Sequence, residues 1–433
     1  MPIRSLTYAS AHDWPALRAW LTQRDAADKN VEPVVRDILH AVRSQGDHAV
    51  KDYTRRFDCP SLDLSSLRVS ADCIQAAVHT IPAQDAAIIR EAAQHIRSFH
   101  ERQRQQSWIT TPNTGTTLGQ LVRPVDRAGL YVPGGQGGET PLISSLLMNA
   151  IPALVAGVET ICVVTPPRKD GTVNPYILAT AAILGLEHLF ACGSAWAIAA
   201  LAYGTETIPQ VDVIAGPGNI YVTTAKRLLA GQVGIDMIAG PSEIAILADA
   251  SANPAWLAAD LLSQAEHDAL ASSLLISPDS TLLERTATEV RSQLAALPRR
   301  DIAQAALRDW SALIHVPDLH TGMDLVNRLA PEHFELSLAD PWAWIGAVRN
   351  AGAVFMGHHS PEPVGDYFAG PNHVLPTLST ARFSSALSVE TFCKKISLIA
   401  TDQSYLAKHG AKVARLARLE GLEAHARSVE HRL

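Results

Sequence analysis

The sequence predicts an α/β protein built on parallel sheets. In the middle of the chain, short apolar strands run into turns rich in glycine and proline, and helical patterns follow the turns. One such unit comprises a strand at 119–125, a turn at 128–138, a helix at 141–157 and a strand at 160–165. Because strand–helix–strand units place their strands parallel, we expect a run of parallel-sheet units here.

Residues 1 to about 110 are expected to be helical. Apolar residues recur at spacings of three and four over 34–57 and 82–108, with polar residues between them. No catalytic pattern is visible in this part of the chain.

The strand and helix pattern continues after residue 165. The expected helices cover 178–186, 195–203 and 220–229, and the expected strands cover 189–192, 211–215 and 244–247. Two related turns, Gly216-Pro217-Gly218-Asn219 and Gly240-Pro241-Ser242-Glu243, stand at the edges of these strands. Ligands of α/β proteins bind at such edges, so both turns are candidates for ligand contact.

The turn at 128–138 is also rich in glycine. Backbone N–H groups at the start of a helix favour a phosphate or carboxylate. The turn matches neither G-x-G-x-x-G nor a Walker loop. It therefore indicates either an anion contact or a tight turn without one.

The last third of the chain adds strands, a long loop and a tail. Strands are expected at 272–277, 312–316 and 353–356, and surface helices at 282–297 and 302–310. The 21 residues of 357–377 form a loop with little regular structure, and such loops in compact domains are functional or disordered. The helical tail, 402–433, has so little core that it should dock on this chain or on a neighbouring subunit.

Composition excludes several classes of protein. The chain has 433 residues, enough for two or more domains, and a net charge of −7 with no long Lys/Arg block, which argues against nucleic-acid and anionic-membrane partners. The five cysteines are scattered without a C-x-x-C pair, as in a protein with reduced thiols. The N-terminus lacks the pattern of a secretory signal. We therefore expect a cytoplasmic protein.

Two pairs of residues carry candidate chemistry. Gln264 and His267 share one face of a helix that starts at Asn253-Pro254, and their oxygen and nitrogen could bind one small dication, although two ligands do not make a zinc site. Glu332 and His333 stand together at the entrance to a strand, where they could act as water activator and base. The alternative for each pair is a solvated polar surface.

The long loop and the tail supply further candidates. Asp366 could be a third metal ligand and His373 a substrate contact. In the tail, Glu420 and His425 are candidates for completing a site elsewhere.

Six stretches in register resemble the histidinol dehydrogenase family over nearly the whole chain. They are 216–219, 236–243, 261–268, 330–336, 365–377 and 420–425. The resemblance implies oxidation of L-histidinol to L-histidine through a retained aldehyde, with two NAD⁺ and one Zn²⁺ per subunit. It implies Gln264, His267, Asp366 and His425 as zinc ligands, with His425 coming from the partner subunit.

The same resemblance assigns the remaining roles. His333 would be the base of the first oxidation, and Glu332 would activate water for the second. The substrate-binding residues would be Ser242, Gln264, His267, His333, Asp366, His373, Glu420 and His425.

On the cofactor side, Tyr131 and Asn219 match the NAD contacts of the family. Trp196 stands where the family usually has glutamine, so we expect the dinucleotide to stack on it. The turn Gln136-Gly137-Gly138-Glu139-Thr140 also departs from the family pattern. Both departures leave open whether NAD is preferred over NADP.

The implied architecture has two incomplete Rossmann-like domains and small helical terminal segments in a domain-swapped homodimer. The expected parts are an N-terminal helical segment (1–25), a first domain on the zinc and substrate side (26–130 and 243–386), an inserted domain on the NAD side (131–242) and a helical dimerisation tail (387–433). One alternative is a relative that oxidises another polar alcohol, such as a sulfonated diol. A zinc-stabilised interaction module without turnover is the other.

Overall fold

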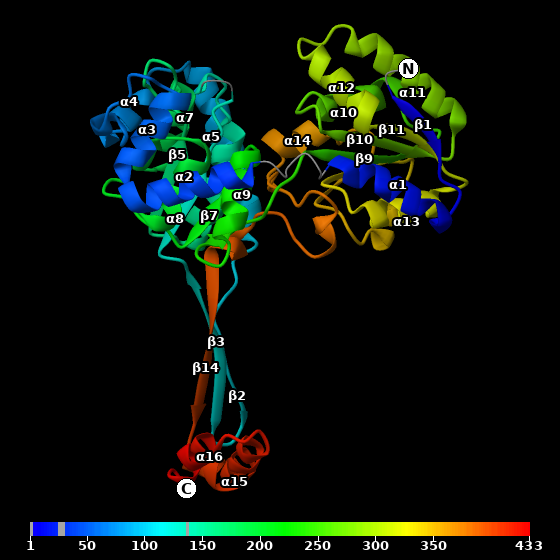
Figure 1. The fold of residues 1–433 in the computed structure, drawn as a ribbon. Helices are drawn as coiled ribbons and strands as arrows, with labels where there is room; N and C mark the ends of the chain where they lie inside the picture. The colour runs from blue at the N-terminus through cyan, green and yellow to red at the C-terminus, as the bar shows by residue number, and fades with distance from the viewer. Residues whose placement is uncertain (1–2, 25–30, 136–137) are drawn as a thin grey trace.

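The computed structural model describes residues 3–24, 31–135 and 138–433. It has two α/β lobes and a narrow stalk that leads from one lobe to a pair of C-terminal helices (Figure 1). Gln136 and Gly137 of the glycine-rich turn, and the expected boundary between 1–25 and 26–130, lie outside the described residues. Among the helices of these residues, none has the length and apolar character needed to cross a membrane.

The first lobe contains a six-stranded parallel sheet in the order β1-β11-β10-β9-β12-β13. Its strands are β1 (Arg4–Thr7), β9 (Glu243–Ala248), β10 (Ser272–Ser277), β11 (Ala312–His315), β12 (His333–Ser337) and β13 (Ala353–Met356). Its helices are α1 (Trp14–Leu21), α10 (Pro254–Ala265), α11 (Ser280–Leu294), α12 (Arg300–Trp310) and α13 (Leu319–Leu329).

Alternating side chains of β9 show how the two faces of this sheet are covered. Ile244 and Ile246 pack in one core with α10, α11 and α12. Ala245 and Leu247 point to the opposite face and pack in a second core with α1 and α13. The period of two along a strand thus places α10 on one defined face of the sheet.

The second lobe contains a five-stranded parallel sheet in the order β6-β5-β4-β7-β8. Its strands are β4 (Arg127–Tyr131), β5 (Thr160–Thr165), β6 (His188–Ala191), β7 (Val213–Ala215) and β8 (Gly234–Ile235). The helices between them are α6 (Ile143–Ala156), α7 (Pro175–Leu184), α8 (Ser194–Tyr203) and α9 (Ile220–Leu229). The expectation of parallel α/β units in the middle of the chain is confirmed.

The N-terminal helices belong to the core of the second lobe. These are α2 (Glu32–Gln45), α3 (Asp47–Phe57), α4 (Ala71–Ala77) and α5 (Ala83–Glu101). Apolar residues of α2 and α3 share a core with α8 and α9, and those of α4 and α5 share one with α6 and α7. The expected grouping of 26–130 with 243–386 therefore differs from the way these helices pack.

Several local expectations need correction. The single helix expected over 34–57 is broken at Gly46, whose φ of +55° does not continue a helix. The N-terminal segment, expected to be helical, also contains β1, which pairs with β11 at the edge of the sheet. Within the expected loop at 357–377 lies a short helix, α14 (Glu362–Tyr367).

The stalk is an antiparallel sheet in the order β14-β3-β2. It consists of β2 (Trp108–Asn113), β3 (Thr116–Pro124) and β14 (Cys393–Thr401), and it leads to α15 (Gln403–Leu419) and α16 (Glu423–Glu430) (Figure 1). The expected strand at 119–125 thus lies in the stalk rather than in a parallel sheet. The C-terminal segment, expected to be helical, begins its path along the stalk as β14.

A buried ion pair holds the turn at Gly216. Lys226 Nζ lies 2.5 Å from Asp236 Oδ1, and both side chains are almost fully buried. The ammonium also donates to the carbonyl of Gly216 (2.9 Å), while Asp236 Oδ2 accepts the N–H of Gly216 (2.8 Å). The pair therefore joins α9 and the chain after β8 to the turn that follows β7.

The Asp236→Ala variant should lower the free energy of unfolding by about 3–5 kcal/mol, because the ammonium of Lys226 is left buried without a counter-charge. Urea unfolding measures this loss. Adding Lys226→Met removes the stranded charge and should recover part of the stability. A double variant no more stable than Asp236→Ala would contradict this explanation.

Candidate active site

The first residue of β9 holds the Glu332-His333 pair. Glu332 Oε2 accepts the N–H of Glu243 (2.9 Å), and His333 Nδ1 lies 3.0 Å from the carbonyl oxygen of the same residue. His333 opens β12, which pairs with β9 in parallel. Both side chains are buried. Strand pairing thus fixes the carboxyl group and the imidazole where the neighbouring strands β9 and β12 begin. The alternative of a solvated surface pair is excluded.

The hydrogen bond to Glu243 sets the tautomer of His333. A carbonyl oxygen only accepts, so Nδ1 carries the proton of the neutral ring and Nε2 carries the lone pair. Burial lowers the pKa of His333 to about 4, so the ring is neutral at pH 7. Within the described residues Nε2 has no hydrogen-bond partner. The imidazole can therefore accept a proton at Nε2.

Burial also acts on Glu332. It raises the pKa of this carboxyl group well above its usual value, and the N–H of Glu243 opposes part of the rise. A carboxylate in such a place is a stronger base than one in water.

The helix α14 brings two more carboxyl groups to His333. Glu362 and Asp366 are four residues apart and share a helix face. Glu362 Oε1 lies 3.8 Å from His333 Nε2 and, among the described residues, has no hydrogen-bond partner. Asp366 Oδ1 lies 3.7 Å from Nδ1 of His373. Ligand atoms of His333, Glu362 and Asp366 lie within 4.8 Å of one another, a spacing that a metal ion could occupy.

Gln264 presents a buried amide that the described chain does not satisfy. It lies near the end of α10 with 0% exposure, and neither its oxygen nor its nitrogen has a hydrogen-bond partner there. Buried amides without partners are rare in folded proteins. The amide oxygen of Gln264 has no other partner among the described residues, so it could bind the Zn²⁺ that the family resemblance implies.

His267 and Ser242 border this region. His267 is exposed one turn beyond Gln264. Burial lowers the pKa values of His333 and His373, and His267 is near enough to both to add to this effect. Ser242 is partly buried and precedes Glu243, and its carbonyl oxygen accepts the N–H of Ser272 (3.0 Å). Both expected residues thus lie near the Glu332-His333 edge.

The tail residues lie elsewhere in the same chain. Glu420 is the C-cap of α15 and His425 lies within α16, and both are exposed at the end of the stalk remote from both lobes (Figure 1). A single chain therefore does not bring His425 to Gln264 or Glu420 to His333.

Two of the expected cofactor contacts meet at the second sheet. Tyr131 ends β4, and its buried hydroxyl accepts the N–H of Ser194 (3.3 Å). Asn219 is exposed and caps α9, with Oδ1 accepting the N–H groups of Tyr221 and Val222. Because β4 and β7 are neighbours, Tyr131 and the turn that carries Asn219 follow adjacent strand ends, where α/β proteins bind ligands.

The expected stacking of a dinucleotide on Trp196 needs correction. Its indole N–H donates to Thr54 Oγ1 (3.0 Å), and its ring stacks with Tyr53 and Phe57 at centroid distances of 5.7 Å. The side chain is 4% exposed. Trp196 therefore belongs to the core between α3 and α8, where it offers no open ring face.

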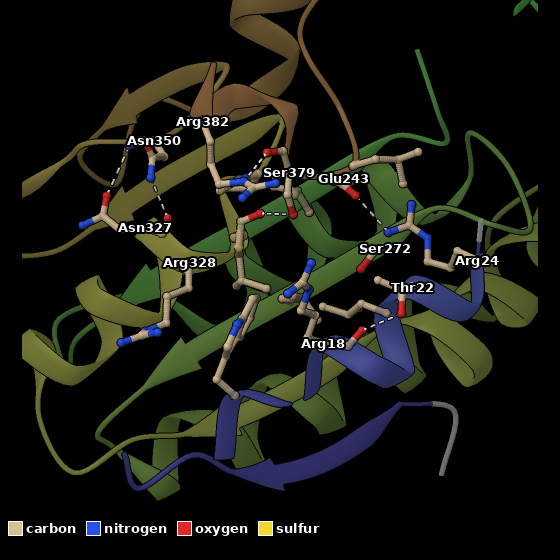
Figure 2. Close-up of a pocket in the computed structure, with 18 of the residues that line it drawn as sticks. Arg18, Thr22, Arg24, Glu243, Ser272, Asn327, Arg328, Asn350, Ser379 and Arg382 are labelled. Carbon is tan, nitrogen blue, oxygen red and sulfur yellow. Dashed lines mark hydrogen bonds and ion pairs between the residues drawn. The ribbon is translucent and has the colours of Figure 1, made fainter. Parts of the chain in front are cut away.

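Glu243 also lines a separate cavity of about 710 Å³. Figure 2 shows Arg24 directed at Glu243, with Arg18, Arg328 and Arg382 among the other lining residues. Arg24 Nη1 lies 3.0 Å from Glu243 Oε1, and the guanidinium also donates to the carbonyls of Leu270 and Pro241. None of the expected site residues lines this cavity, and it adjoins the site through the Arg24–Glu243 ion pair.

Sequence reasoning missed Glu362. The available signal was Pro361, which ends the extended segment and starts a helix, so that a carboxyl group and Asp366 fall four residues apart. Because 357–377 is expected to be a loop, the helical spacing of Glu362 and Asp366 is not expected.

Comparisons with known proteins agree with the geometry. A model of the histidinol dehydrogenase family matches residues 21–433. The chain is 63% identical to histidinol dehydrogenase of Oleidesulfovibrio alaskensis over 433 residues, covering 100% of both chains. It is 51% identical to that of Bacillus subtilis over 408 residues, covering 94% of both. The crystal structure of histidinol dehydrogenase from Elizabethkingia anophelis superposes with a TM-score of 0.92 at 35% identity, covering 100% of this chain and 98% of the other.

The core position of Trp196 predicts a specific phenotype. Trp196→Gln should lower the free energy of unfolding by about 3 kcal/mol or more, as truncation of a buried tryptophan does. The dissociation constant for NAD⁺ should change less than about threefold, under about 1 kcal/mol. Urea unfolding and calorimetric titration with NAD⁺ measure the two effects.

The matched control is Trp342→Gln, since Trp342 is 70% exposed and its loss should leave stability nearly unchanged. A tenfold loss of NAD⁺ affinity in Trp196→Gln without loss of stability would show that the ring contacts the cofactor.

Proposed function

The chain belongs to the histidinol dehydrogenase family of oxidoreductases, and we propose that it oxidises L-histidinol to L-histidine through L-histidinal, reducing two NAD⁺. The observation that carries the proposal is the buried Glu332-His333 pair held by the backbone of Glu243, together with the orphaned amide of Gln264 on α10. The pair supplies a proton acceptor and a carboxyl group, and the amide oxygen can bind a metal ion.

We assign the metal to Gln264, His267 and Asp366, with His425 of the partner subunit as the fourth ligand and one Zn²⁺ per subunit. The orphaned amide of Gln264 supports this set. The cluster of His333, Glu362 and Asp366 is the competing set, but His333 Nε2 is then lost as a base. Bound zinc would hold the imidazole and amino nitrogens of the substrate.

The substrate contacts proposed in addition are Ser242, His333 and His373, with Glu420 of the partner subunit. The carboxylate of Glu420 can accept a hydrogen bond from an N–H group of histidinol. Together with the zinc ligands, these residues keep the aldehyde bound between the two oxidations.

In the first oxidation, His333 Nε2 accepts the hydroxyl proton of the substrate as hydride leaves its carbon. NAD⁺ supplies the hydride acceptor. The hydrogen bond from Nδ1 to Glu243 keeps the ring oriented and supports the imidazolium that forms. Burial ensures that His333 starts each cycle neutral at pH 7.

The second oxidation needs a hydrated aldehyde. Glu332 accepts a proton from the attacking water, while its Oε2 stays anchored to the N–H of Glu243. Glu332 must be ionised to accept this proton. Burial raises its pKa, and the hydrogen bond from the N–H of Glu243 opposes burial by favouring the ionised form.

We assign the cofactor to the edge of the second sheet, with Tyr131 and Asn219 as contacts. Residues 131–242 form the proposed NAD side of the enzyme. Trp196 is left out because its indole N–H is bonded to Thr54 and its ring stacks with Tyr53 and Phe57.

A domain-swapped homodimer is proposed from the tail. The stalk and tail expose large apolar side chains, namely Ile109, Ile396, Ile399, Leu416, Leu419 and Leu422. Exposed apolar patches of this kind mark association surfaces. A partner that covers them would bring its own Glu420 and His425 to the site of this chain.

The alternative within the family is oxidation of a sulfonated diol. Glu420 argues against it, because a carboxylate would repel a sulfonate. An interaction module without turnover would leave the neutral base at His333 without a purpose.

A cytoplasmic location is proposed as well, supported by five free cysteines.

Incubating the purified protein with L-histidinol and NAD⁺ tests the activity directly. NADH counted against histidine should give a ratio of about two, since two hydrides leave each substrate molecule. Activity on a sulfonated diol without formation of histidine would sink the assignment.

Mixed dimers test the shared site. His425→Ala and His333→Ala dimers should each be inactive, and subunit exchange should restore about a quarter of wild-type activity, because half the dimers then carry one intact site. Size-exclusion chromatography of tagged subunits confirms exchange. Exchanged dimers without any activity would show that His425 acts within its own chain.

A further inference from the structure

Glu335 is a buried carboxyl group that the proposed mechanism does not use. It lies on β12 two residues after His333 and is 4% exposed. Side chains two apart on a strand share a face, so Glu335 points to the same face of the sheet as His333. The paired residues of β9, Ile244 and Ile246, pack in the core of α10. Glu335 therefore faces the helix that carries Gln264.

Glu335 caps α14 from outside that helix. Its Oε1 accepts the N–H of Glu362, the first residue of α14, at 2.9 Å. The first N–H groups of a helix have no partner within it, and Pro361 at the N-cap provides no side-chain hydrogen bond. The start of α14 is thus held by a side chain of the sheet.

Asp260 joins this cap to α10. The carboxyl groups of Asp260 and Glu335 interact with each other, so the pair connects β12 to α10. Burial raises the pKa of both carboxyl groups, which lessens the repulsion between them. Asp260 lies four residues before Gln264 on the same face of α10.

We propose that the Asp260–Glu335 pair is a positioning device that fixes α14 against α10, and thereby fixes Asp366 relative to Gln264 at the metal site. One side of the pair sits a helical turn before Gln264, and the other holds the N–H of Glu362, a helical turn before Asp366. Asp260 and Glu335 contact neither the metal nor the substrate in this scheme. The inference rests on the proposed metal roles of Gln264 and Asp366.

Four variants and zinc binding itself test the proposal. Glu335→Leu and Asp260→Ala remove the pair, and we expect the zinc dissociation constant, from chelator competition, to rise about tenfold or more, as loss of a partner of a ligand typically does. Glu335→Gln and Asp260→Asn keep an acceptor for the N–H of Glu362 and a hydrogen bond within the pair. Their zinc affinity should stay within about threefold of wild type.

The matched control is Leu313→Ala, which weakens the same sheet at β11 without touching α14. It should lose stability but keep its zinc affinity and the visible absorption bands of its cobalt-substituted form. Those bands should shift in Glu335→Leu, because the ligands are displaced.

Wild-type affinities of both Glu335→Leu and Asp260→Ala would overturn the positioning role while leaving the proposed activity intact. An equal loss of zinc in Leu313→Ala would also overturn it, since the effect would then reflect stability alone. Failure of the wild-type protein to bind zinc would overturn the metal assignment itself, and this inference with it.

Discussion

The backbone of Glu243 is the point on which the catalytic edge depends. Its N–H holds Glu332 and its carbonyl holds His333, while Arg24 pairs with its side chain from the cavity behind. Strand pairing of β9 and β12 sets these contacts, and burial then keeps the imidazole neutral. As a result, Nε2 of His333 can accept a proton at the point where the neighbouring strands β9 and β12 begin.

Three buried side chains of the proposed site have polar groups that the described chain leaves unsatisfied. The amide of Gln264, Nε2 of His333 and Oε1 of Glu362 are all buried without hydrogen-bond partners. Each such group costs about 1–3 kcal/mol unless something else satisfies it. We propose that these positions are filled by the substrate, the metal and the tail of a second subunit. Their binding would supply the interactions that the buried groups lack.

Much of this arrangement follows from local patterns in the sequence. The helix α9 was expected at its observed bounds, and the Glu332-His333 pair was placed correctly at the entrance to a strand. Pairing partners were not predictable. Whether β3 joins a parallel sheet or the stalk depends on β14, about 270 residues later, and local periodicity carries no such information.

Trp196 and Glu362 show the same limit at the level of single side chains. The neighbours of Trp196 come from α3, far earlier in the chain, so its position in the sequence did not reveal that the ring is enclosed. Glu362 became visible as a site residue only when β12 placed His333 beside α14. Spacing within one element indicates the pairs Gln264-His267 and Glu332-His333, whereas it does not indicate contacts between elements such as those of Trp196 and Glu362.

Diffraction at the zinc absorption edge, from crystals of the zinc-loaded protein, tests the central claim most directly. The account predicts an anomalous peak bounded by Gln264, His267 and Asp366 and by His425 of the partner subunit, with His333 Nε2 left outside the coordination sphere. A peak held by His333 and Glu362, with the amide of Gln264 uninvolved, would contradict it.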